Sequence, residues 1–200
     1  MFIVINKMKT DQKIIKALIK SPDTNTISAL SGEIGISRQG VFKVVKRLEL
    51  ERLLRLSKVG KGRTSIFVIK LNWQNPILEK QAAIILLDEA QKNQRWITNF
   101  IELEKNVKFT LIFGSVLTSP KEAKDIDLIN VASDFITIDK IINATQKTQT
   151  KKIHALNLTE AEIREELAKG NPALTEAIKK GVVLFGHENF IKFIRGLNGS

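Results

Sequence analysis

The stretch Phe109–Ala132, FTLIFGSVLTSPKEAKDIDLINVA, contains two apolar runs separated by a more polar segment. The first run, Phe109–Phe113, has the length and β-branched content of a buried strand, and Gly114-Ser115 follows where that strand would end. The second run alternates between polar and apolar residues from Asp125 to Val131. The stretch therefore predicts two strands, with Gly-Ser directly after the first.

The two aspartates of the second strand are predicted to share one face of a sheet. Side chains alternate along a strand, so Asp125 and Asp127 point one way while Ile126 and Leu128 point the other. Two neighbouring carboxylates repel each other and lose hydration unless a cation lies between them. Mg²⁺ (or Mn²⁺), bound by one or two carboxylates and by substrate phosphates, suits such a pair.

Gly114 and Ser115 suit the phosphates of a nucleotide. A glycine lets the backbone approach a phosphate closely, and a serine can donate from its hydroxyl and its N–H. Gly-Ser, the spacer Val116–Lys124 and Asp-x-Asp together resemble the signature of the DNA polymerase β-like nucleotidyltransferases. The closest resemblance is to the minimal nucleotidyltransferases of archaea and bacteria, over roughly residues 95–190.

The resemblance implies a nucleotidyltransferase activity with Asp125 and Asp127 as catalytic metal ligands. It also implies a nucleoside triphosphate held at Gly114 and Ser115, and transfer of a nucleotide to a hydroxyl acceptor. Family members that transfer nucleotides generally use a third carboxylate on the next strand. The matching segment here, Lys152–Leu158, offers His154 and Asn157 but no carboxylate. His154 could act as a base, although a single histidine on a strand is more often structural. Nucleotide binding is therefore the firmer prediction, and transfer stays open.

Two other aspartates lie between the predicted strand that ends at Val131 and the one that begins at Lys152. Asp134 and Asp139 precede and occupy a predicted helix, where a helix cap and a solvated face are the expected roles. Neither is therefore counted among the predicted metal ligands.

The first third of the chain predicts three helices followed by a hairpin. The helices are expected at Asp11–Lys20, Thr26–Gly32 and Ser37–Leu54, and the strands at Leu54–Val59 and Ser65–Leu71, joined by Gly60-Lys61-Gly62-Arg63. This order resembles the winged-helix fold over roughly residues 8–73.

The basic charge of the chain is concentrated in the same region. Residues 1–75 carry 15 Lys and Arg against 5 Asp and Glu, whereas residues 76–200 carry 17 against 16. Such an asymmetry indicates that the N-terminal part meets a polyanion, and double-stranded DNA is the predicted partner. The alternative is a winged helix that contacts proteins, with its lysines as a solvated face.

The predicted DNA-binding residues lie at the start of the third helix, along its polar side and at the hairpin tip. The helix start is the part expected to enter the major groove, where arginine and glutamine can read base edges and lysines contact phosphates. They are Ser37, Arg38, Gln39, Lys43, Lys46, Arg47, Lys58, Lys61 and Arg63.

The remaining segments complete an α+β prediction. Asn72–Pro76 ends the first domain, and a long helix over Ile77–Glu104 is expected to break near Lys92–Gln94, with Trp96 and Phe100 in the core. Residues 74–94 are assigned to a linker helix and 95–200 to a nucleotidyltransferase-like mixed sheet flanked by helices. Its later elements are expected at Asp134–Gln146 (with Ile136, Ile138, Ile141 and Ile142 inward), Lys152–Leu158, Glu160–Lys169 (capped by Thr159), Ala173–Lys180, Gly181–Phe185 and Glu188–Arg195.

Composition excludes several classes of site. The chain has no cysteine and two histidines, which rules out disulfides and thiolate ligands and speaks against zinc. The apolar run at the start is too short for a signal peptide, and nothing approaches a spanning length, so a cytoplasmic protein without a membrane is expected.

Other partners follow from the two predicted domains. Winged-helix regulators commonly dimerise, and the helix Ile77–Gln94 is the expected dimer surface. A catalytically silent transcriptional regulator remains an alternative function. So does an antitoxin-like interaction module, because minimal nucleotidyltransferases often resemble antitoxins paired with a small helical toxin.

Overall fold

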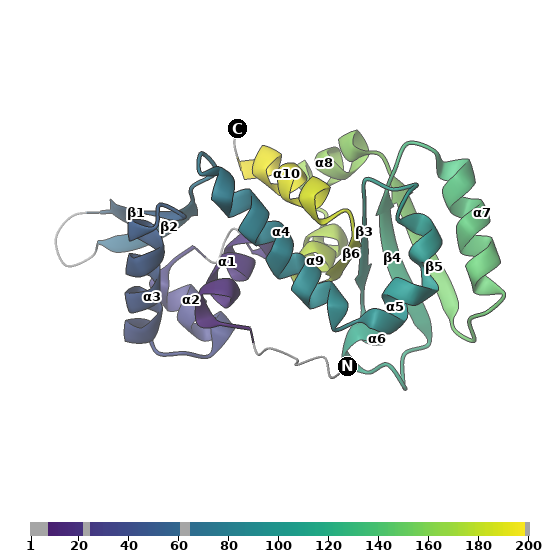
Figure 1. Ribbon diagram of the computed structural model, residues 1–200, viewed down its shortest axis with the longest axis horizontal. Helices are drawn as coiled ribbons and strands as arrows, with labels where there is room; N and C mark the ends of the chain where they lie inside the picture. Colours follow the sequence, from purple (N-terminus) through teal and green to yellow (C-terminus); the bar gives the residue numbers. More distant parts are fainter. Residues whose placement is uncertain (1–7, 22–24, 61–64, 199–200) are drawn as a thin grey trace. The chain divides into compact units, whose positions relative to one another are not determined.

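The computed structural model describes residues 8–21, 25–60 and 65–198. The chain divides into two compact units, residues 1–82 and residues 83–200, here called the N-terminal unit and the sheet unit. The division falls within helix α4, Pro76–Gln91, which continues from one unit into the other (Figure 1). No helix in the described part of the chain combines the length and apolar composition needed to cross a membrane.

The N-terminal unit contains three helices and a β-hairpin. The elements are α1 Thr10–Lys20, α2 Ile27–Ile34, α3 Arg38–Leu50, β1 Leu54–Val59 and β2 Ile66–Leu71, with β1 and β2 antiparallel. Each of them contributes buried apolar side chains, among them Ile14, Leu18, Leu30, Val41, Val45, Leu48, Leu54 and Ile69. The predicted order of helix, helix, longer helix and hairpin is confirmed.

The turn between α2 and α3 is fixed by local sequence. Gly35 ends α2 with φ at 68°, a left-handed conformation that carries no Cβ penalty in glycine. The hydroxyl of Ser37 then accepts a hydrogen bond from the Gly40 N–H at 3.1 Å, so Ser37 caps α3. Together they set the direction in which α3 leaves the turn.

Two predicted helix ends in this unit are wrong. Helix α3 ends at Leu50 rather than Leu54, because Arg52 adopts a left-handed φ of 58° and Leu54 is the buried first residue of β1. Helix α2 continues to Ile34, beyond the predicted end at Gly32, since the left-handed glycine that stops it comes only at the next position.

The sheet unit begins with an interrupted helix. The segment predicted as Ile77–Glu104 breaks at Lys92 and Asn93, as expected, into α4, α5 (Gln94–Asn99) and a 3₁₀ turn (Ile101–Leu103). The strands that follow are β3 Phe109–Phe113, β4 Asp125–Val131, β5 Lys152–Leu158 and β6 Val182–Phe185. The helices between and after them are α6 Ser115–Thr118, α7 Phe135–Gln146, α8 Glu160–Ala168, α9 Pro172–Lys180 and α10 His187–Asn198.

The four strands form one mixed sheet in the order β5-β4-β3-β6. Strand β3 is antiparallel to β4 and β6, whereas β4 and β5 run parallel. In this register Asp127 lies opposite Phe113 on one side and His154 on the other. The fold class, α+β with a mixed sheet flanked by helices, is confirmed.

Helices cover both faces of the sheet (Figure 1). One face packs against α5 and α7 in a core that includes the predicted Trp96 and Phe100, together with Ile112, Leu128 and Ile138. On the other face Phe109 meets two phenylalanines of α10, with ring centroids 5.3 Å from each of Phe190 and Phe193. By strand alternation the second face also carries Asp125 and Asp127.

One predicted core residue of α7 is exposed. Ile138 and Ile142 are buried and Ile141 packs beside them, but Ile136 is 70% exposed. Residues four apart lie on the same side of a helix, whereas Ile136 lies two residues before Ile138 and so points to the opposite side. The prediction that all four isoleucines face inward is therefore wrong for Ile136.

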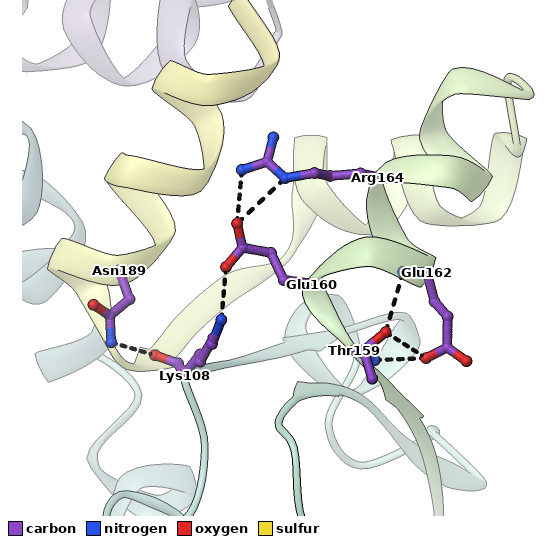
Figure 2. Close-up of polar contacts among 6 residues, drawn as sticks. All are labelled: Lys108, Thr159, Glu160, Glu162, Arg164 and Asn189. Carbon is purple, nitrogen blue, oxygen red and sulfur yellow. Dashed lines mark hydrogen bonds and ion pairs between the residues drawn. The ribbon is translucent and has the colours of Figure 1, made fainter.

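Figure 2 shows the polar contacts that fix the start of α8. Thr159 Oγ1 accepts a hydrogen bond from the Glu162 N–H at 3.2 Å, and the Thr159 N–H donates to Glu162 Oε2 at 2.7 Å. This confirms the predicted capping box. Next to it Glu160 accepts from Lys108 Nζ at 3.0 Å and from Arg164 Nη2 at 2.8 Å, which ties α8 to the chain entering β3.

Candidate metal site and DNA-binding surface

Two carboxylates and one imidazole converge where β4 begins. Asp125 and Asp127 come from β4, and His154 comes from the parallel neighbour β5. His154 Nδ1 lies 3.7 Å from Asp125 Oδ2 and 3.7 Å from Asp127 Oδ1. These three side chains, here called the acidic site, each offer one ligand atom within 4.8 Å of the others.

Gly114 borders the acidic site at the end of β3. Its φ is 80° and its ψ −164°, a region of the backbone map that is open almost only to glycine. A Cβ at this position would collide with Asp127 Oδ2, so the backbone passes directly against the carboxylate. Ser115 follows with an exposed side chain. Both predicted nucleotide-binding residues therefore lie beside the predicted metal ligands.

The charge of Asp127 is disfavoured in the folded protein. Burial, and then the charge of Asp125, raise the pKa of the Asp127 carboxyl above its ordinary value, while His154 opposes the shift. A raised carboxyl pKa means that the folded protein holds the charged form at a cost in stability. A cation between the carboxylates would remove that cost, so the residues present fit one metal ion.

The side chains that could hold a metal ion are not the three carboxylates that the resembled family generally uses. The metal-holding group found among the described residues contains two carboxylates and the imidazole of His154. Asp134 caps α7 through a hydrogen bond from the Thr137 N–H at 3.1 Å, the helix-cap role expected for it. Asp139 accepts from Asn157 Nδ2 at 2.8 Å, on the sheet face away from the acidic site.

His154 is the site residue whose place the sequence identified least well. A histidine on a strand has many structural roles, and its approach to both aspartates depends on the parallel register of β4 and β5. The available signal was position: His154 is the third residue of a strand that follows Asp-x-Asp after one helix. Its exposed side chain, next to two carboxylates, now distinguishes it from a core histidine.

A row of exposed polar and basic side chains lies along α3. The predicted residues Arg38, Gln39, Lys43, Lys46 and Arg47 are all exposed, as is Lys58 on β1; these six are called the basic surface. Lys61 and Arg63 lie outside the described residues.

Ion pairs neutralise part of the basic surface. Lys46 Nζ lies 2.8 Å from Glu49 Oε2, and Arg47 Nη2 lies 3.2 Å from Asp11 Oδ2. The contact with Lys46 is also the main cause that lowers the pKa of Glu49. Arg38 and Lys43 make no ion pair within residues 8–21, 25–60 and 65–198, which leaves them available for phosphates or bases.

Comparison with known proteins agrees with this geometry. Residues 9–55 match the family described as winged helix-turn-helix DNA-binding, a segment that spans α1, α2 and α3 and enters β1. The N-terminal unit therefore contains a winged helix-turn-helix DNA-binding domain. Neither the curated proteins nor the solved structures give a match to the chain.

The winged helix-turn-helix assignment gives each element a role. Helix α3 occupies the position of the recognition helix, the element whose N-terminal residues meet base edges in such domains, and the β1–β2 hairpin follows it where these domains have a wing. Ser37 starts α3 and therefore sets the position of Arg38 and Gln39. The matched segment ends before Phe109–Ala132, so the acidic site rests on its own geometry.

Proposed function

We propose that this DNA-binding protein binds a divalent cation with a nucleoside triphosphate at the acidic site. The observation that carries the proposal is the convergence of Asp125, Asp127 and His154 beside the Gly114 backbone. It agrees with the resemblance of Gly-Ser and Asp-x-Asp to the polymerase β-like nucleotidyltransferases. The DNA-binding domain would then bring the nucleotide site to particular DNA sequences.

The proposed roles follow from chemistry and position. Asp125 and Asp127 supply the oxygen ligands that Mg²⁺ or Mn²⁺ prefers, and His154 supplies a nitrogen. Gly114 lets a phosphate approach the backbone, and Ser115 donates its hydroxyl to a phosphate oxygen. When bound, the cation neutralises phosphate charge and orients the triphosphate.

Transfer of the nucleotide to a hydroxyl acceptor is the finer part of the proposal. Such a transfer needs a group that accepts the hydroxyl proton. The imidazole of His154 lies beside Asp125 and Asp127 and is a group that can accept such a proton, and it stands where the family uses a carboxylate. We therefore assign His154 two proposed roles, third metal ligand or proton acceptor, which exclude each other for a given nitrogen atom.

Calorimetric titration tests nucleotide binding. MgATP, MgGTP and the Mn²⁺ forms of both would be titrated into the wild type, the Asp125→Ala/Asp127→Ala variant and the control Asp88→Ala, which removes an exposed carboxylate from α4. Binding by the wild type and control but not by the double variant is the expected result. Absence of binding to the wild type, or equal binding by all three proteins, would refute the proposal.

His154→Gln then separates the two proposed roles of His154. If the imidazole is a metal ligand, the variant binds Mn²⁺ about tenfold more weakly in the absence of nucleotide. If it is the proton acceptor, Mn²⁺ affinity is retained and nucleotide transfer is lost.

A second candidate function is a dimeric transcriptional regulator. Helix α4 exposes Ile77, Ile84 and Leu87, a spacing typical of a helix that pairs with another helix. Sedimentation of the wild type beside Ile84→Asp tests the dimer: a shift from dimer to monomer supports it, and a monomeric wild type contradicts it. A small helical toxin remains a predicted partner, to be sought by co-purification with the neighbouring gene product.

A further inference from the structure

An exposed aromatic pair lies between the recognition helix and the wing. Phe42 of α3 and Phe67 of β2 are each 39% exposed, and their ring centroids are 6.2 Å apart. A single exposed apolar side chain is ordinary on a protein surface. Two phenylalanine rings in contact on one side of a recognition helix need a more specific explanation.

Phe42 lies among the residues of the basic surface that α3 carries. It lies one helical turn after Arg38 and one turn before Lys46, so these three side chains are neighbours on one side of α3. Lys46 Nζ lies 5.9 Å from the centroid of the Phe42 ring. Lys43, which has no ion pair within the described residues, is the next residue along the chain.

We propose that Phe42 reads thymine by packing its ring against the 5-methyl group in the major groove. The 5-methyl group is the apolar feature that distinguishes thymine in that groove, and phenylalanine is one of the side chains that contact it. Phe42 follows the residues of α3 that such domains place against base edges. This inference rests on the DNA-binding assignment and is independent of the acidic site.

Phe67 supports the proposed contact by holding the Phe42 ring. A ring in contact with a second ring on the hairpin has fewer conformations to lose when it binds, which lowers the entropic cost of the contact. Phe67 is thus a positioning residue that holds Phe42 toward the groove.

The surroundings favour DNA over a protein partner. Lys46 Nζ lies near the ring, and the exposed residues Arg38 and Lys43 belong to the same helix. An apolar protein surface docking here would have to strip water from the charges of Arg38 and Lys43, which have no ion pair among the described residues, and this is unfavourable. The phosphates on either side of the major groove would pair with them instead.

A uracil scan tests the proposal directly. The wild-type protein first selects duplexes from a randomised pool, and each thymine of the selected site is then replaced singly by uracil, which lacks only the 5-methyl group. We expect replacement at one thymine per bound domain to weaken binding about fourfold, the effect of one buried methyl-sized group. A selected site without thymine, or a site that tolerates uracil at every position, overturns the proposal.

Variants assign the effect to Phe42. Phe42→Ala should bind the thymine duplex about fourfold more weakly than the wild type and should no longer distinguish thymine from uracil. Leu50→Ala is the matched control, because Leu50 is an 85% exposed apolar residue of the same helix, and it should keep the wild-type preference.

Equal weakening by Phe42→Ala on both duplexes would indicate a sugar contact or a structural role and would overturn the assignment. Loss of self-association with unchanged DNA affinity would overturn it as well.

Failure of the proposal remains distinguishable from failure of DNA binding itself. Salt-sensitive binding to the selected duplex, without any effect of uracil, removes the role of Phe42 and leaves the domain assignment intact. The uracil scan uses the unmodified protein, so the absence of any uracil effect would overturn the proposal even if Phe42→Ala does not fold.

Discussion

Arg38 and Lys43 stand in solvent on the recognition helix, without ion pairs among the described residues, whereas Asp127 is partly buried between a second carboxylate and an imidazole. The basic surface thus consists of separate charges on one helix, each of which can act without the others. The acidic site needs three side chains from two strands and a close backbone approach from a third. Loss of one residue should therefore weaken the first gradually and disable the second.

The largest expected effect concerns salt and the basic surface. DNA affinity should fall about a thousandfold as salt rises from about 50 to about 200 mM, because several Lys and Arg contacts release counterions. Arg38→Ala/Lys43→Ala should lower the slope of log affinity against log salt by about 2 if both contact phosphates. Fluorescence anisotropy on a labelled duplex measures both quantities.

Asp125→Ala/Asp127→Ala is the control for the salt experiment. Its salt slope should equal that of the wild type, because the acidic site lies outside the matched DNA-binding segment. A wild-type affinity that does not respond to salt would contradict the role of the basic surface. A changed slope in the control would show that the acidic site contributes to DNA binding and does not act separately from the basic surface.

The second effect concerns the backbone of Gly114. Gly114→Ala should destabilise the protein by about 2–3 kcal/mol, because alanine disfavours this backbone conformation and its Cβ would collide with Asp127. Gly170→Ala is the matched control in the same unit. The φ of Gly170 is 75°, but no atom lies within 4 Å of the position that its Cβ would take. The control should cost about 1 kcal/mol. Urea unfolding measures both values.

Gly114→Ala should also weaken Mn²⁺ binding by about tenfold or more, since it displaces the carboxylate of a proposed ligand. Gly170→Ala should bind Mn²⁺ like the wild type. Equal costs for the two alanine variants in stability and in metal affinity would show that Gly114 does not hold the acidic site in place.

Much of the fold follows from periodicity in the sequence. Strands β3 and β5 begin and end at the predicted residues, because each is an apolar or alternating run bounded by polar residues. The shared face of Asp125 and Asp127 follows from the same alternation. Caps at Ser37 and Thr159 were predictable because the capping side chain and its partner are close in sequence.

Features that depend on distant residues were not predictable in this way. The contact of His154 with both aspartates requires the parallel pairing of β4 with β5, which no local pattern specifies. The exposure of Ile136 depends on which side of α7 meets the sheet, and an isoleucine-rich segment gives no clear answer. Phe42 shows the same limit, since its contact with Phe67 joins a helix to a strand beyond a turn.

A smaller effect tests the repulsion within the acidic site. Asp127→Asn should stabilise the metal-free protein at pH 7 by about 0.5–1 kcal/mol, because burial and Asp125 raise the pKa of Asp127 and the charged form is disfavoured in the folded state. The gain should disappear below the ordinary carboxyl pKa, where the aspartate is protonated in both states. Thermal unfolding in EDTA as a function of pH measures it.

Asp88→Asn is the control for this effect, because Asp88 is exposed on α4 and should leave stability unchanged. Addition of Mn²⁺ should reverse the order and make the wild type more stable than Asp127→Asn, since a ligand that binds only the folded state stabilises it. A destabilised Asp127→Asn in EDTA would mean that His154 already compensates the charge. The acidic site would then resemble the basic surface in carrying its charges without strain.

A pH-dependent effect concerns His187 at the start of α10, a partly buried titratable group outside the acidic site. Burial lowers the pKa of His187, while the backbone of Val183 and the charges of Glu104 and Glu89 oppose the shift. Its Nε2 is buried and has no hydrogen-bond partner among the described residues. The unfolded chain therefore binds a proton more readily, so His187 should lower the free energy of unfolding as the pH falls below its ordinary pKa of about 6.5.

The slope that His187 adds to stability against pH cannot exceed about 1.4 kcal/mol per pH unit. His187→Gln should flatten urea-unfolding stability between about pH 7 and about pH 5, where histidine titrates, whereas His154→Gln should retain the acid sensitivity that His187 causes. A variant at His187 with the wild-type pH profile would refute this assignment and leave the acidic site as the sheet unit's identified source of pH dependence.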